Sequence, residues 1–266
     1  MAKLYIGDSQ GTPAIIKIEE VPKKKFGVSI DNLLGDVDED GNYAVPTGEF
    51  VLDLTGVKHV SDFALAYRFY KSVGLKKVLA TDLETVGDSG FYYAFNRCNE
   101  LGEAVFGIRE VPRSSSYAFA YAFSSSNNVS PEFPFLRSVA AFNAFQQAFG
   151  DSIIEPSKVF PSLEEITGQS TFYDFAKGFV DNLALFPKLK KITGPASKYS
   201  GIFYSYSNYT TSIFKFPEAT EVTGYVFHSS FIGEIHFAAA NQAAIEACDG
   251  YANKWGASAA SIFFDL

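Results

Sequence analysis

An acidic segment near the start of the chain has the residue spacing of a calcium-binding loop. Asp36, Asp38 and Asp40 are followed by Gly41, which corresponds to oxygen ligands at loop positions 1, 3 and 5 and a glycine at position 6. The glutamate that such a loop needs at position 12 is replaced by Thr47. We therefore expect a turn with solvated carboxylates, and a Ca²⁺ site at the three aspartates is the alternative interpretation. No other cofactor is indicated.

Histidine and cysteine residues are too few and too scattered to indicate catalysis. His59, His228 and His236 follow no Ser/His/Asp order, and Cys98 and Cys248 form no CxxC or Cys/His spacing typical of a zinc site. No glycine-rich phosphate loop follows an expected strand. The chain is therefore predicted not to be an enzyme. A polysaccharide lyase or hydrolase on a β-solenoid is the catalytic alternative, and it would require carboxylates gathered in one groove.

Aromatic residues are the unusual part of the composition, with 27 Phe and 15 Tyr against one Trp and one Met. Rings that recur through a chain suggest equivalent, stacked positions rather than one irregular core. Several tyrosines exceed what such a core needs and are interleaved with Ser and Asn, which is the chemistry of adaptable recognition surfaces. The predicted binding residues are Tyr92, Tyr117, Tyr121, Tyr173, Tyr199, Tyr204, Tyr206 and Tyr209.

A repeated motif, Phe-Pro-x-Leu-x-x-(Val/Ile), sets the period of the chain. It begins at Phe133, Phe160 and Phe186, and in a weaker form at Phe216, with spacings of 27, 26 and 30 residues. Its two aliphatic positions continue upstream without Phe-Pro, as the pairs Val57/Val60, Leu83/Val86 and Ile108/Val111. A coil of this length is too small to bury its own apolar edge, so successive coils are predicted to stack about 4.8 Å apart.

A second series with the same period combines an aromatic, a small and an aliphatic residue at three-residue steps. The expected instances are Phe69/Ser72/Leu75, Phe95/Cys98/Leu101, Phe123/Ser126/Val129 and Phe179/Asn182/Leu185. A small polar residue fits a tight turn and can hydrogen-bond the backbone of the neighbouring coil, so Cys98 is expected to be one rung of a structural ladder. Together the two series predict a β-rich repeat solenoid of about seven coils, each of 25–30 residues.

The segment from Val86 to Leu101, with its Ala94-Phe95 pair followed by Cys98, resembles a BspA-type leucine-rich repeat. The coil of that family has an apolar strand, an Ala-Phe pair, Cys or a small residue, and then Leu. Residues 121–129 follow the same order, and the resemblance covers roughly residues 50–235. It implies a leucine-rich-repeat-like solenoid that binds rather than catalyses. Longer inserts rich in Tyr and Ser in the fifth and sixth coils depart from the family pattern.

Three parts are expected along the chain. Residues 1–47 lack the repeat and are predicted to form a short N-terminal β segment, either a cap or an attachment arm, and residues 48–235 form the solenoid. Residues 236–266 are predicted to be a C-terminal cap, with a helical stretch that includes Ile245 and Cys248 and a closing strand around Ile262. The style of both ends resembles leucine-rich proteins from phage and prophage tail regions of gut bacteria.

Charge and hydropathy exclude several classes of partner. A net charge of −8 and a pI near 5.0 argue against nucleic acid, which needs clustered Lys and Arg to displace counterions. No segment approaches the about 20 apolar residues of a membrane span, so membrane insertion is not expected. The first residues also lack the pattern of an ordinary signal peptide.

The interpretation that fits these patterns best is a non-catalytic, virion- or tail-associated adhesin. It would present the solenoid surface to a host glycan or protein, or to other subunits of the virion, and its expected location is the virion or an extracellular surface. A BspA-type bacterial surface adhesin and a self-assembling lattice or filament subunit are the alternatives. Whether the chain forms a homo-oligomer is left open.

Overall fold

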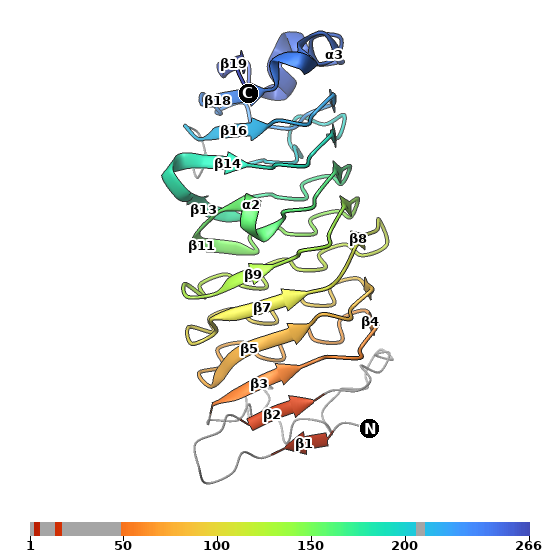
Figure 1. Cartoon of the computed structure of the whole chain (residues 1–266), viewed down its shortest axis with the longest axis vertical. Helices are drawn as coiled ribbons and strands as arrows, with labels where there is room; N and C mark the ends of the chain where they lie inside the picture. Colours follow the sequence, from red (N-terminus) through yellow and green to blue (C-terminus); the bar gives the residue numbers. More distant parts are fainter. Residues whose placement is uncertain (1–2, 6–13, 18–48, 206–210) are drawn as a thin grey trace.

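The computed structural model describes residues 3–5, 14–17, 49–205 and 211–266 of the chain. These residues form a parallel β-solenoid of about eight turns, stacked along the long axis of the molecule (Figure 1). The predicted repeat solenoid is confirmed, with about eight turns where about seven coils were expected. Asp36, Asp38 and Asp40 lie outside the described residues, so the calcium hypothesis stays a prediction.

The first side of the solenoid carries three successive sheets. The strand order β1-β2-β3-β5-β7-β9 comes first, and only its β1–β2 pair is antiparallel. The parallel pair β11–β13 follows, and then β14-β16-β18-β19. The bounds are β1 Lys3–Tyr5, β2 Ala14–Lys17, β3 Phe50–Asp53, β5 Leu75–Ala80, β7 Glu103–Phe106, β9 Ser130–Glu132, β11 Phe149–Ile154, α2 Pro156–Val159, β13 Ala176–Phe179, η1 Val180–Asn182, β14 Leu183–Leu185, β16 Ile213–Phe216, β18 Glu234–Phe237 and β19 Ser261–Phe264.

The second side consists of short strands that place one aliphatic residue of each coil in the core. These strands are β4 His59–Val60, β6 Thr85–Val86, β8 Glu110–Val111, β10 Ser138–Val139, β12 Glu165–Ile166, β15 Lys191–Thr193 and β17 Glu221–Thr223. Val139 lies in register with Val111 and Ile166, and the same column continues through Ile192 to Val222. This is the Val/Ile position of the repeat motif, so the predicted register is confirmed.

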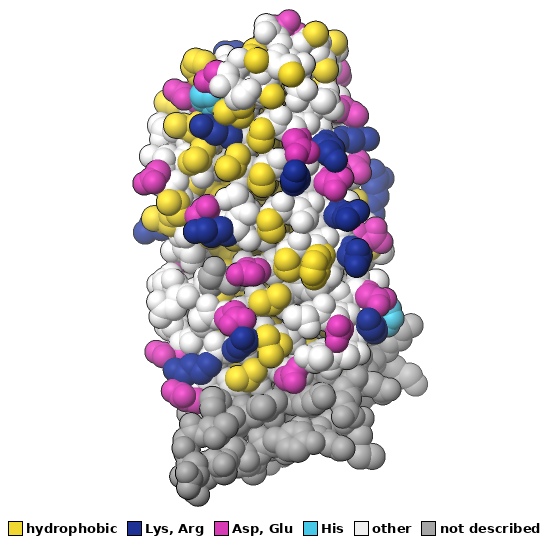
Figure 2. Space-filling model, in the orientation of Figure 1, with side chains coloured by type: hydrophobic (Ala, Val, Ile, Leu, Met, Phe, Trp, Pro, Cys, Tyr) yellow, Lys and Arg dark blue, Asp and Glu magenta, His cyan; other side chains and the backbone are white. Residues whose placement is uncertain are grey.

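Charged side chains line the outer surface of the second side. Lys58 pairs with Glu84 at 2.8 Å, and Lys191 lies between Glu165 and Glu221 at 3.4 and 3.6 Å. Figure 2 shows this alternation of basic and acidic side chains along one edge of the molecule. All these groups are substantially exposed, and each such ion pair therefore contributes little to stability.

The third side, which we call the turn ribbon, is a run of consecutive tight turns. It comprises residues 61–72, 87–98, 115–126, 141–150 and 168–175 in successive coils. Backbone bonds within a coil alternate with bonds to the next coil: the Arg68 N–H donates to the Leu65 carbonyl at 3.2 Å, whereas the Tyr67 N–H donates to the Tyr92 carbonyl at 2.9 Å. Two residues of every four point inward, and the next two point outward.

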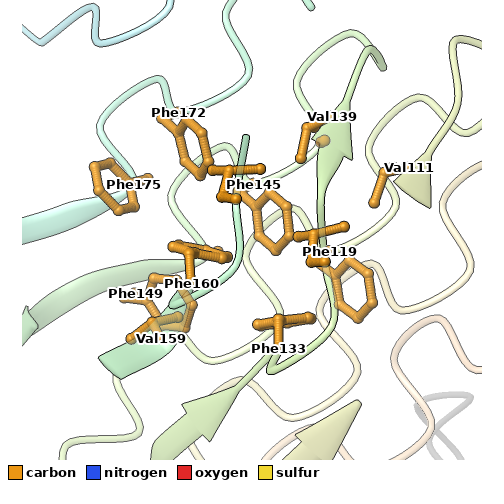
Figure 3. Packing of buried hydrophobic residues seen from close by; sticks show 14 of the residues in the cluster. Val111, Phe119, Phe133, Val139, Phe145, Phe149, Val159, Phe160, Phe172 and Phe175 are labelled. Carbon is orange, nitrogen blue, oxygen red and sulfur yellow. The ribbon is translucent and has the colours of Figure 1, made fainter. Parts of the chain in front are cut away.

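The inward residues of the turn ribbon build columns of parallel rings. Phe119 stacks between Phe91 at 5.0 Å and Phe145 at 5.3 Å, and the column continues to Phe172 at 5.4 Å. Figure 3 shows Phe119, Phe145 and Phe172 one behind the other, with Phe133 and Phe160 meeting them from the first side. Fully burying a Phe side chain is worth about 1.5–3 kcal/mol. The repeated rings are therefore the core of the fold.

The aromatic–small–aliphatic series is confirmed in three coils and wrong in the fifth. Phe95 stacks between Phe69 at 5.9 Å and Phe123 at 5.4 Å, as the period requires. In the fifth coil, however, Ala176 lies in register with Phe149, and Phe179 lies in register with Ile154. The column of stacked rings therefore ends at Phe149, whose ring meets Phe175 edge to face at 6.4 Å. A register shift between Phe149 and Ile153 in β11 is the reason.

Short helices cover part of the C-terminal end. They are η2 Ala239–Asn241, α3 Gln242–Glu246 and η3 Tyr251–Gly256, and the left-handed Gly250 (φ 87°) separates the last two. Ile245 and Trp255 are fully buried, and the Trp255 carbonyl accepts the Val226 N–H at 2.9 Å. β19 adds one further parallel strand beside β18. The predicted helical stretch and closing strand are therefore both present at this end.

Candidate binding surface

Three tyrosines occupy the same outward position of the turn ribbon in successive coils. The ring of Tyr93 stacks on Tyr67 at 4.9 Å and on Tyr121 at 4.4 Å, with interplanar angles of 9° and 11°. Their backbones are left-handed, with φ values of 60°, 53° and 57° for Tyr67, Tyr93 and Tyr121. A residue other than Gly, Asn or Asp is uncommon in this conformation. The ribbon holds it because the cross-coil hydrogen bonds fix the backbone on both sides.

Further rings surround this stack and complete what we call the tyrosine cluster: Tyr67, Tyr70, Tyr92, Tyr93, Tyr117 and Tyr121. Tyr92 meets Tyr93 edge to face at 4.8 Å and Tyr67 at 5.5 Å. Tyr117 lies 6.2 Å from Tyr92 and 5.4 Å from Phe142. Tyr67 is 50% exposed, whereas the other five are partly buried. The cluster therefore presents ring edges and hydroxyl groups held in fixed positions.

The hydroxyl groups of Tyr67, Tyr93 and Tyr121 stay neutral at physiological pH. Burial, followed by the neighbouring Tyr92, raises the pKa of Tyr67 to about 12, and burial together with Tyr121 raises the pKa of Tyr93 to about 12. The pKa of Tyr121 is also raised, mainly by burial. Its hydroxyl accepts a hydrogen bond from Gln146 Nε2 at 3.2 Å. The surface therefore offers neutral hydroxyl donors and acceptors beside apolar ring carbons.

A groove of about 400 Å³ runs beside the tyrosine cluster, where the second side meets the turn ribbon. Its lining residues are Arg113, Ala140, Phe142, Thr167, Gln169, Thr193, Gly194 and Pro195. At Gly194 the chain lies so close to the next coil that a Cβ would collide with the Tyr225 carbonyl. Phe142 belongs to both features, since its ring contacts Tyr117 and lines the groove.

The side of the solenoid that the turn ribbon forms, which we call the turn face, carries a second, smaller aromatic group further along the chain. Tyr173 stacks on Tyr204 at 5.6 Å, and Tyr204 meets His228 edge to face at 4.4 Å. Burial lowers the pKa of His228 and raises that of the nearby Asp174. A depression of about 170 Å³ beside this group is lined by Tyr199, which is 70% exposed, among other residues.

The structure brings together some of the predicted tyrosines and separates others. Tyr92, Tyr117 and Tyr121 belong to the tyrosine cluster, whereas Tyr173, Tyr199 and Tyr204 belong to the second group. Tyr204 is only 3% exposed, so its ring supports Tyr173 more than it offers a surface. Tyr206 and Tyr209 lie outside the described residues. The prediction missed Tyr67, Tyr70 and Tyr93. Ala-Phe pairs recur every four residues within a coil, and this spacing could have indicated that the tyrosines between such pairs point outward.

Residue types that can catalyse reactions or bind metals form no reactive site in the described part of the chain. Cys98 is fully buried, its Sγ donates to the Phe69 carbonyl at 2.9 Å, and burial raises the pKa of its thiol to about 12. The Ser126 hydroxyl accepts the Cys98 N–H at 2.9 Å, so Cys98 is a rung of the predicted ladder. Among the described residues, no group of three or more His, Cys, Asp or Glu side chains could hold a metal ion. No helix in the described ranges is long and apolar enough to cross a membrane.

No protein-family model, no curated protein and no solved structure matches the chain. Its class is therefore defined by the fold and the surface alone. The chain is a parallel β-solenoid protein with an aromatic turn face. The resemblance to BspA-type repeats stays a prediction.

Proposed function

We propose that the chain is a non-catalytic adhesin, associated with a virion or its tail, that binds a host-surface glycan or protein through its turn face. The observation that carries the proposal is the tyrosine cluster, six tyrosines from neighbouring coils held in mutual contact at the surface. Tyr rings give a large contact area at a low cost in conformational entropy. Stacked coils also repeat this surface over a longer distance than a compact domain offers.

Binding of the purified full-length chain to host cells and to an array of glycans tests the proposal. We expect the Tyr67→Ala/Tyr117→Ala double variant to lose about tenfold or more in apparent affinity, because aromatic anchors dominate such surfaces. Phe135→Ala is the matched control, since Phe135 is a ring with 52% exposure that lies between β9 and β10, away from the turn ribbon. Equal loss in both variants, or binding by neither the variants nor the parent chain, would contradict the proposal.

The setting in which the adhesin acts is a separate part of the proposal. A BspA-type adhesin on a bacterial surface would use the same turn face, so the binding experiment does not distinguish it from a virion component. Antibody labelling of intact virions and of the producing bacteria does. We expect label on the virion, and label confined to the bacterial surface would favour the alternative.

A self-assembling subunit is the second candidate, and the end of the first side favours it. In the described part of the chain β19 pairs only with β18, which leaves its outer backbone edge open. Phe263 and Leu266 are 38% and 39% exposed beside that edge, and open strand edges are templates for pairing between chains. Sedimentation distinguishes the two candidates: a 29.1 kDa monomer favours the adhesin acting alone, and filaments lost in Phe263→Lys favour assembly.

A further inference from the structure

The groove beside the tyrosine cluster is locally basic in an acidic protein. Arg113 is the only charged residue in its lining, where no Asp or Glu is present, whereas the whole chain has a net charge of −8. Arg113 is exposed, and among the described residues it takes part in no ion pair. Its guanidinium therefore faces no carboxylate in the described part of the chain, and its N–H donors have the fork geometry that matches a carboxylate of a ligand.

The other polar groups of the groove are neutral and are spread over successive coils. Thr167 and Gln169 belong to the coil after Phe142, and Thr193 belongs to the next one. Three strand spacings separate the coil of Arg113 from that of Thr193, a distance of about 14 Å. The groove therefore presents one cation at one end and the Thr167 hydroxyl and Gln169 amide along its length, whereas the hydroxyl oxygen of Thr193 is buried.

An aromatic wall accompanies these polar groups. Phe142 is 37% exposed and is held by its edge-to-face contact with Tyr117 at 5.4 Å. An exposed ring of this kind packs against the C–H face of a sugar ring, while hydroxyl and amide groups bond to the sugar hydroxyls. The combination of a ring, a hydroxyl and an amide fits an oligosaccharide, because a sugar ring presents both hydroxyl groups and an apolar C–H face.

From this arrangement we infer that the groove binds an acidic oligosaccharide, with a sugar carboxylate on Arg113 and a sugar ring against Phe142. The inference rests on the proposed binding function and names the class of ligand for the same face. A carboxylate on a guanidinium forms two parallel charge-assisted hydrogen bonds, which are stronger than those between neutral groups. Nucleic acid is a poorer fit because a polyphosphate backbone needs several clustered cations, and the groove has one.

Calorimetric titration of the full-length chain tests the inference with four named probes. The acidic probes are 3′-sialyllactose and trigalacturonate, and the neutral controls are lactose and maltotriose. We expect the acidic probes to bind, and their affinity to fall as the salt concentration rises. Arg113→Gln should weaken that binding about tenfold or more, and Arg113→Lys should retain part of it. Arg97→Gln is the matched control, because Arg97 is an exposed arginine of the turn ribbon that does not line the groove, and the variant should bind like the parent chain.

The outcomes separate this inference from the proposed function. Absence of heat with both acidic probes, or equal affinity for acidic and neutral probes in the parent chain and Arg113→Gln, overturns the acidic-sugar assignment. The proposed function survives that result if the Tyr67→Ala/Tyr117→Ala variant still loses cell binding. Acidic-probe binding that Arg97→Gln weakens as much as Arg113→Gln also overturns the assignment, because the effect would then come from net charge alone.

Discussion

Replacing Phe119 by alanine is the most direct test of the stacked-ring core. Phe119 is fully buried and touches four other rings. It is parallel to Phe91 and Phe145, and it meets Phe106 at 5.3 Å and Phe133 at 5.0 Å edge to face. The neighbouring rings cannot move into the space that the Phe119 side chain leaves, because they are themselves fixed in columns.

The expected loss of stability follows from these contacts. Phe→Ala in a protein core costs about 3–5 kcal/mol, and the cost depends on how far the site can collapse. Collapse is restricted here, since the Phe119 N–H donates to the Ala144 carbonyl at 2.8 Å and the Phe91 N–H donates to the Ala118 carbonyl at 2.9 Å. We therefore expect the upper end, about 5 kcal/mol, which is a large share of the roughly 5–15 kcal/mol of a typical domain.

Urea unfolding followed by two signals measures this loss and its location. Circular dichroism reports on all coils, whereas Trp255, the single tryptophan, reports on the C-terminal end. Because a coil contacts mainly its neighbours, Phe119→Ala should separate the two transitions, with the circular dichroism change coming first. Phe63→Ala is the control, since Phe63 is 43% exposed and its truncation should cost less than about 1 kcal/mol. Equal free energies of unfolding for the two variants would refute the stacked-ring core.

Three further predictions concern the ladder and the tyrosine cluster. Ser126→Ala should cost about 1–3 kcal/mol, because it removes two buried hydrogen bonds, from the Cys98 N–H to the Ser126 hydroxyl and from that hydroxyl to the Phe95 carbonyl; Ser72→Ala should cost much less, because the Ser72 hydroxyl has no hydrogen-bond partner among the described residues, and equal costs would contradict the ladder. Cys98 should resist thiol reagents in the folded chain and react once urea unfolds it, since its thiol pKa is about 12; fast native labelling at Cys98 would be inconsistent with its burial. Tyr67 and Tyr93 should hold their protons to about pH 12, against the ordinary value of 10.0, so stability is unaffected below pH 10 and falls as the pH rises from 10 to 12. Phenolate absorbance in the parent chain and in variants of these two tyrosines checks this, and titration of both near pH 10 would disprove it.

The sequence predicts the parts of the fold that repeat with constant spacing. The column from Val111 to Val222 was predicted with its register, because each coil contributes the same buried aliphatic residue at a similar interval. The prediction failed at Phe179, which lies in register with Ile154 because β11 has two more residues than β13 between their paired positions. A period defined by spacing alone cannot locate an insertion within a coil, since the same apolar residues match the pattern on either side of it.

The candidate site was harder to predict than the fold, because it depends on which residues point outward. Tyr92, Tyr117 and Tyr121 were predicted from composition, whereas Tyr67 and Tyr93 were not. Their outward direction follows only once the turn ribbon, with its period of four, replaces an extended strand of period two. The groove has no signal in any single coil, since its lining comes from the corners of several coils.

The left-handed positions of the turn ribbon show which residue types the fold requires and which it only tolerates. At the position equivalent to Tyr67, Tyr93 and Tyr121, the next two coils have Gln147 and Asp174, with φ values of 46° and 43°. The ribbon therefore forms equally well without a ring there. A left-handed residue of this kind costs roughly 1–2 kcal/mol, which is about 3–6 kcal/mol for three tyrosines. The two stacked pairs return about 0.5–1.5 kcal/mol each, so the stack does not offset the cost of its backbone conformation. Because stability does not favour these rings over smaller polar residues, their presence in three successive coils supports a role in binding.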